Sequence, residues 1–212
     1  MSQTLTDLAA QLEARIKELR KAGDLDALLA TAREAAREIE QRIDRADWND
    51  AQRSALMAVQ RLAYNAAADC WPGWSVPSEP SHQRRLIAAR ELALHSSELV
   101  ERLGLPPRRK GTGIWLVGAF DLAIGKYAEA SSNFTDAREH YATAGAPDLV
   151  LLMDGYLAIV QQVGRDGASV DGTGLDQVCA RISAGDFKEG PAWIAQLRTA
   201  QEAFARGVRQ DG

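Results

Sequence analysis

The sequence predicts an all-α protein of about nine helices packed as antiparallel hairpins. Apolar residues recur at every third or fourth position over most of the chain, as they do from Leu5 through Leu12 to Leu19. No segment shows the sustained alternation of apolar and polar residues that is typical of a half-buried strand. Aromatic residues make up only 6% of the chain and alanine is abundant, which favours closely packed helices over sheets.

Glycine, proline and N-cap residues place the expected helices in order. The first two span about 5–22 and 25–43, and the third begins near Asp47 or Asn49 and reaches Cys70. The fourth runs from Ser81 to Gly104, where Pro106 and Pro107 close it. The remaining helices are expected at about 113–124, 127–144 and 148–163, then as a short helix ending near residue 184, and finally at about 188–206.

The whole chain, 1–212, reads as one helical domain. Two segments interrupt the helical pattern, a proline- and glycine-containing loop at 70–80 and a glycine-rich loop at 164–174. The helix expected at 148–163 contains an unbroken apolar run, Leu149–Met153, which leaves it little polar surface. We therefore expect that helix to be covered, either by its neighbours in the chain or by a second copy.

Three helix junctions share one local pattern. Each has Gly, a polar residue, a large apolar residue, two mostly polar residues and a mostly small residue, at Gly23–Leu28, Gly125–Ala130 and Gly185–Gly190. The glycine allows one helix to stop and the chain to reverse, the large residue fills the corner, and the small residue lets the second helix come close. The pattern predicts helical hairpins.

The middle copy resembles the tetratricopeptide repeat over residues 113–144. Gly118 stands at the small position of the first helix, and Ala130, Phe134 and Ala137 follow the small-large-small pattern of the second. Asp121 departs from the family, which usually has a large apolar residue there. The 60 residues from Gly125 to Gly185 are not a multiple of the family's roughly 34-residue period, so any array is irregular. An unrelated helical bundle is the alternative.

This resemblance implies a non-catalytic interaction module that binds a peptide or helix of a partner protein on its concave face. Its groove positions in the first helix of the repeat would include Thr112, Trp115, Ala119 and Leu122, which are mostly small or apolar and suit an apolar partner segment. Trp71 and Trp74 lie in a proline-rich loop and could supply a second aromatic wall. Their simpler role is to fill the ends of neighbouring helices.

Two other classes stay open. The first is an enzyme or small-ligand protein with a pocket near Asp69–Trp74, which would require Asp69, His82 or His95 to meet Cys70 in one cleft. The second is a structural homodimer built on the helix at 148–163. The chain has no familiar catalytic motif, so we expect no catalytic residues, no cofactor and no metal site. Asp166, Asp171 and Asp176 lack the spacing of a calcium loop.

Charge and hydropathy argue against two classes of partner, nucleic acids and membranes. The formal net charge is −4, which argues against general binding of nucleic acid, although seven basic residues fall between 81 and 110. No apolar run approaches the ~20 residues that would span a membrane. The N-terminus lacks the pattern of a secretory signal, and two cysteines do not form a disulfide framework. We expect a cytoplasmic protein whose partner is another protein.

Overall fold

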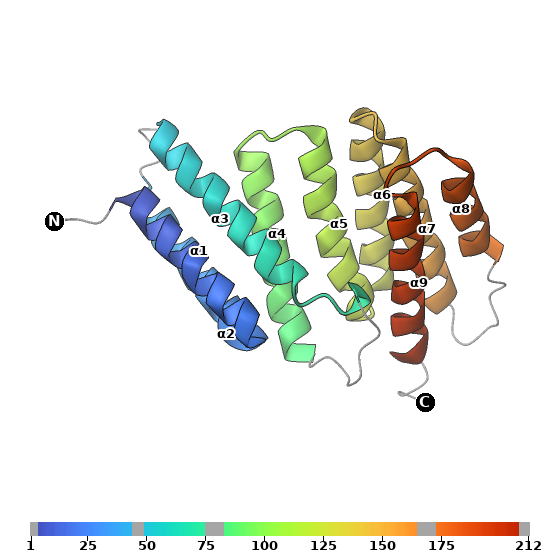
Figure 1. The fold of residues 1–212 in the computed structure, drawn as a ribbon, viewed down its shortest axis with the longest axis horizontal. Helices are drawn as coiled ribbons and strands as arrows, with labels where there is room; N and C mark the ends of the chain where they lie inside the picture. The colour runs from blue at the N-terminus through green and yellow to red at the C-terminus, as the bar shows by residue number, and fades with distance from the viewer. Residues whose placement is uncertain (1–3, 44–48, 75–82, 165–172, 208–212) are drawn as a thin grey trace.

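The computed structural model describes residues 4–43, 49–74, 83–164 and 173–207, and within them every regular element is a helix (Figure 1). The predicted all-α class is therefore confirmed. In chain order the elements are α1 (Leu5–Ala22), α2 (Leu25–Gln41), α3 (Asp50–Ala68), the 3-10 turn η1 (Pro72–Trp74), α4 (Gln83–Arg102), α5 (Pro107–Ala123), α6 (Tyr127–Thr143), α7 (Pro147–Val163), α8 (Thr173–Ala184) and α9 (Gly190–Gly207).

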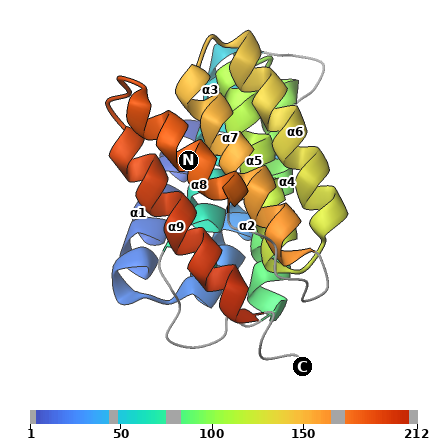
Figure 2. The same ribbon diagram turned by 90° about the vertical axis from the view of Figure 1, so that its right-hand side faces the viewer.

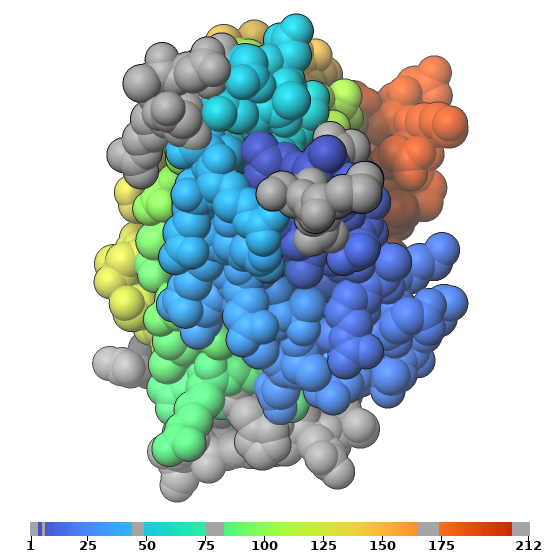
Figure 3. All heavy atoms as spheres, turned by 90° about the vertical axis from the view of Figure 1, so that its left-hand side faces the viewer, coloured from blue at the N-terminus to red at the C-terminus, as the bar shows by residue number. Residues whose placement is uncertain are grey.

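The helices form two layers, each helix packing against the next in the chain from α1 to α7. Helices α1, α3, α5 and α7 make the layer nearer the viewer in Figure 1, and α2, α4 and α6 lie behind them, as the side view in Figure 2 also shows. We call the first layer's outer surface the front face. Figure 3 looks at the end of this array, which α1 and α2 close side by side.

Four of the turns between helices share one hydrogen-bonded cap. Gly23, Gly104, Gly125 and Gly145 all have a φ between 60° and 78°, the left-handed conformation that glycine adopts without strain. At Gly125, the glycine N–H donates to the carbonyl of Leu122, and the N–H of Lys126 donates to that of Asp121. This pair of bonds ends the helix and reverses the chain. Two of the three predicted repeat turns, at Gly23 and Gly125, have this cap, whereas Gly185 does not.

One helix boundary differs clearly from the prediction. Helix α5 begins at Pro107, six residues before the expected Gly113. Proline is favoured at the first position of a helix because its missing N–H has no partner there in any case. Pro107 therefore opens α5, while the chain between α4 and α5 is only four residues long, 103–106. Expectations that rest on Ser81, His82, Asp166 or Asp171 lie outside the described residues.

The α5–α6 hairpin is tightly packed around Gly118. A Cβ atom added to Gly118 would lie 2.9 Å from the Cβ of Asn133 and 3.1 Å from the ring of Phe134. Only a residue without a side chain allows this approach. Ala130, Phe134 and Ala137 are fully buried on the α6 side of the contact, as the hairpin pattern predicts.

Helix α7 is covered within the chain. Leu149, Leu151, Leu152 and Met153 are all buried, and Val150 is half-buried. Neighbours on three sides, α6, α8 and α9, supply this cover. The apolar run that suggested a homodimer thus faces other helices of the same chain.

Helix α9 does not extend the two-layer array. It turns back from α8 and runs along the front face, where it contacts α7 and η1 (Figures 1 and 2). Leu197 of α9 is fully buried against Gly155 of α7, where an added Cβ would lie 2.5 Å from a Leu197 methyl carbon. Gln196 also donates a hydrogen bond of 2.7 Å to the hydroxyl of Tyr156.

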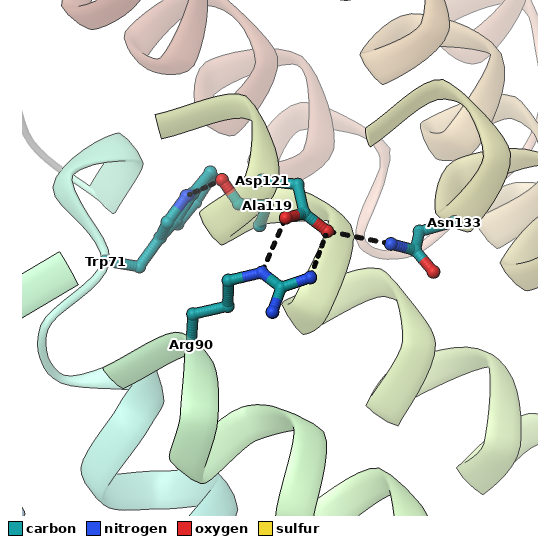
Figure 4. A network of polar contacts seen from close by, with 5 residues as sticks. All are labelled: Trp71, Arg90, Ala119, Asp121 and Asn133. Atoms are coloured by element: carbon teal, nitrogen blue, oxygen red, sulfur yellow. Dashed lines mark hydrogen bonds and ion pairs between the residues drawn. The ribbon is translucent and has the colours of Figure 1, made fainter. Parts of the chain in front are cut away.

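A buried carboxylate joins the three central helices. Asp121 of α5 is 0% exposed and accepts hydrogen bonds from Arg90 of α4, at 2.5 and 3.3 Å, and from the side-chain amide of Asn133 of α6, at 2.9 Å (Figure 4). The position where the tetratricopeptide repeat has a large apolar residue is thus filled by an ion pair. Both carboxylate oxygens have partners, as a buried charge requires.

We expect Asp121→Ala to lower the free energy of unfolding by ~3–5 kcal/mol, because it leaves the Arg90 guanidinium without its counter-charge in a largely buried place. Urea denaturation followed by circular dichroism measures the change. The double variant Arg90→Met/Asp121→Leu removes both charges and should regain most of the loss. Equal stability of Asp121→Ala and the unchanged protein would contradict the structural role of this pair.

Candidate functional site

The residues that the sequence analysis selected for binding lie mostly inside the protein. Four of the six are buried: Trp71, Trp115, Ala119 and Leu122, of which Trp115 is 5% exposed. Thr112 is half-buried, and Trp74 is exposed at 47%. Trp115 and Ala119 lie on the side of α5 that faces Trp71, and other parts of the chain cover them there.

The cover over α5 is an aromatic cluster formed by four segments. The ring of Trp71 lies 5.6 Å from that of Trp115 on α5, 5.9 Å from Tyr156 on α7 and 6.4 Å from Phe204 on α9. The Trp71 indole N–H donates to the carbonyl oxygen of Ala119 at 3.3 Å, as Figure 4 shows. The tryptophan loop therefore joins α5, α7 and α9 as a structural plug, and only Trp74 at its edge presents a large aromatic surface to solvent.

The proposed catalytic group does not assemble within the described residues. Asp69 pairs with Arg20 at 2.6 Å, and Cys70 is buried. Burial raises the pKa of the Cys70 thiol to about 12, with the nearby carboxylates of Asp69 and Asp26 adding to the rise and Arg85 opposing it. His95 lies between α2 and α4, where its Nε2 is 3.1 Å from a carboxylate oxygen of Glu40. Cys70 therefore has neither the ionisation nor the base of a nucleophile.

A pocket of about 180 Å³ opens between α3 and α5, on the layer that forms the front face. The residues that line it have polar side chains except for one glycine: Gln60, Arg61, Tyr64 and Asn65 from α3, and Arg109, Thr112 and Gly113 from α5. On α3, residues 60, 61, 64 and 65 lie one turn apart and so share one side of the helix. On α5, the early start at Pro107 places Arg109 and Thr112 in the first two turns, beside that stripe.

Some of these side chains already have partners within the protein. Gln60 donates to the hydroxyl of Ser96 at 3.0 Å, and the Thr112 hydroxyl donates to the carbonyl of Arg108 at 2.9 Å. Arg61 pairs with Glu13 of α1. Arg109, by contrast, is exposed and makes no ion pair with a carboxylate of the described chain. The side chains of Tyr64 and Asn65 likewise have no hydrogen-bond partner within that part.

The electrostatics of this pocket favour an anion. Burial raises the pKa of Tyr64, so its hydroxyl remains protonated and can donate, although the positive charge of Arg109 acts in the opposite direction. The first turn of α5 holds Arg108, Arg109 and Lys110 and no acidic residue, and of these Lys110 is paired with Glu101 at 2.5 Å. The N-terminal end of a helix carries a partial positive charge, so each positive side chain there is unfavourable by roughly 0.3–1 kcal/mol. A bound anion would relieve that repulsion.

This pocket was not predicted from the sequence. The basic stretch that includes Arg109 is visible there, but the helix was expected to begin beyond it, so the approach of Arg109 to α3 was not anticipated. The residues of the two helices are 44 or more positions apart in the chain (Asn65 to Arg109). The one local signal is the run Arg108–Lys110 directly after two prolines, where a helix N-terminus would ordinarily carry acidic residues.

A second pocket, of about 120 Å³, lies behind the front face between α2 and α4. It is lined by both signs of charge: Arg33 pairs with Glu91 at 2.9 Å, and Nε2 of His95 lies 3.1 Å from a carboxylate oxygen of Glu40. These pairs attach the α1–α2 hairpin to α4. We interpret this second pocket as part of that attachment.

Comparisons of the chain with protein families, with curated proteins and with solved structures found no match. The tetratricopeptide resemblance stays a prediction from the sequence. Within the described residues, no three His, Cys, Asp or Glu side chains gather in a way that could hold a metal ion. In the same part of the chain, no helix combines the length and the apolar character needed to cross a membrane.

We expect Trp115→Ala to lower the free energy of unfolding by ~3–5 kcal/mol, because it empties the centre of the aromatic cluster. Trp74→Ala is the matched control, since it removes the same side chain from an exposed position and should cost much less. Chemical denaturation of both variants gives the comparison. If Trp115→Ala unfolds at the same denaturant concentration as the unchanged protein, then Trp115 does not hold the tryptophan loop and α7 on α5.

Cys70 should resist alkylation in the folded protein. With its pKa raised to about 12, its thiolate fraction at pH 8 is roughly a thousandfold below that of an ordinary exposed thiol. Iodoacetamide labelling at pH 8, read by peptide mass spectrometry, should be slow at Cys70 until denaturant is added. Rapid native labelling would instead indicate an accessible, activated cysteine and would favour the enzyme alternative.

Proposed function

We propose that the protein is a non-catalytic interaction module that binds a segment of a partner protein on its front face, at the pocket between α3 and α5. One observation carries this proposal. On a face whose apolar residues are largely covered by η1 and α9, a polar pocket stays open and holds a cation, Arg109, that no described carboxylate neutralises.

The architecture is suited to such a role. Layered arrays of helical hairpins present long surfaces on which side chains from successive helices meet, and similar arrays bind peptides or helices in that way. The tetratricopeptide-like pattern of the α5–α6 hairpin agrees with this reading. Because a fold does not determine a function, the pocket supports the proposal and the fold is only consistent with it.

The two competing classes have less support. An enzyme at Asp69–Trp74 would need Cys70 beside a base, whereas Cys70 is buried and Asp69 is paired with Arg20. A homodimer through α7 would need an open apolar face on that helix, which its neighbours in the chain cover. We propose a cytoplasmic location, with which the two free, buried cysteines, Cys70 and Cys179, are compatible.

We expect Arg109→Glu to abolish capture of the native partner, because it reverses the charge of the open pocket. Lys126→Glu is the matched control: it makes the same charge change on an exposed residue at the α5–α6 turn, the opposite end of α5. Affinity capture from the native lysate with all three proteins, quantified by mass spectrometry, identifies a protein retained by the unchanged chain and by Lys126→Glu but lost by Arg109→Glu. If capture is the same with all three, the pocket is not the binding site.

A further inference from the structure

We propose that the α3–α5 pocket receives side-chain carboxylates of an acidic partner segment, and that the same segment places an apolar side chain on Trp74. This inference rests on the proposed function and names the chemistry of the partner. It is carried by the charge of the pocket, by its size and by the position of the exposed tryptophan.

The side chains around the pocket carry an excess of positive charge. The carboxylates of Glu13, Asp69 and Glu101 are each engaged by a basic side chain, Arg61, Arg20 and Lys110 respectively. Arg108 and Arg109 are exposed and make no ion pair within the described chain. A ligand that enters here therefore meets a net positive charge together with the N-terminus of α5, and both favour an anion.

The free hydrogen-bonding groups suit a carboxylate. Arg109 can grip two oxygen atoms at once, and the hydroxyl of Tyr64 and the amide of Asn65 can donate to the same group. The pocket volume of about 180 Å³ leaves room for an acidic side chain. The net charge of −4 opposes binding of a nucleic acid.

Trp74 gives the segment a second contact. Its ring centroid lies 5.9 Å from that of Trp115, and Trp115 follows Arg109 by six residues, or about 9 Å along α5. Trp74 is thus roughly 10–15 Å from Arg109, a span of about three to five residues of extended chain. We therefore expect the partner to carry one or two acidic residues separated by that interval from a large apolar residue.

The test uses the full chain and a defined probe, a fluorescein-labelled, C-terminally amidated peptide with two adjacent glutamates four positions before a leucine. Fluorescence anisotropy at low salt should show binding, and replacing both glutamates by glutamine should weaken it about tenfold or more. Binding should also weaken as salt is added. A glutamine peptide that binds equally well would overturn the proposal.

Variants of the protein separate the two contacts. Arg109→Glu should weaken binding of the glutamate peptide about tenfold or more, whereas Lys126→Glu should leave it unchanged. Tyr64→Phe keeps the ring and removes only the hydroxyl, so a smaller loss is expected with no loss of stability. Trp74→Ala should weaken this peptide but not a version with alanine in place of the leucine. Loss of binding in Lys126→Glu equal to that in Arg109→Glu would show a mere charge effect and contradict the pocket.

Two further probes test whether the bound anion is a carboxylate or belongs to another class. The inference is overturned if the glutamate peptide does not bind but inorganic phosphate or a single-stranded oligonucleotide binds in an Arg109-dependent manner. The ligand would then be an anion other than a carboxylate. In that case the proposed function still stands if Arg109→Glu loses the captured partner. If neither the peptide nor the captured partner depends on Arg109, both proposals fail.

Discussion

The buried carboxylate of Asp121 constrains the arrangement of the central helices. A fully buried carboxylate is stable only while it is paired. Arg90 of α4 and Asn133 of α6 must therefore both reach Asp121 on the same side of α5. That requirement fixes how α5 is rotated about its axis. With Asp121 directed between α4 and α6, the opposite side of the helix faces the front of the molecule, where Trp115 and Ala119 meet Trp71. The arrangement of the front face thus depends on the Arg90–Asp121 ion pair on the other side of α5.

Local patterns in the sequence were sufficient for the helices and most of their ends. Glycines at 23, 104, 125 and 145 end helices through conformations that only neighbouring residues determine, which is why the predicted boundaries there are confirmed. Pro107 was the exception, because a proline can close one helix or open the next and nothing local decides between them. The closely packed α5–α6 hairpin was also predictable, since Gly118 and Phe134 meet through a short connection.

The cover on the front face was not predictable in the same way. The sequence pattern can group Trp115 and Ala119 on one side of their helix, but whether that side is open depends on segments far away in the chain. Trp71 comes from 44 residues before Trp115, and Phe204 from 89 residues after it. Their contacts are tertiary, and no periodicity within one helix reports them. The pocket has the same origin, because Arg109 and Asn65 become neighbours only when α3 and α5 pack.

The resulting front face separates two tasks that a binding surface usually combines. Apolar residues that would otherwise be exposed, and so invite non-specific association, are used internally to hold η1 and α9 on α5 and α7. In the described part of this face, a charged pocket stays open, and Trp74 and Met57 of α3 are exposed. Charged groups at the surface accelerate encounter and discriminate between partners more than they add affinity, because solvent and salt screen them. Under the proposed function, a surface of this kind suits a partner that is recognised quickly, held by a few contacts and released again; in that proposal the ring of Trp74 provides most of the apolar contact and Arg109 most of the selectivity.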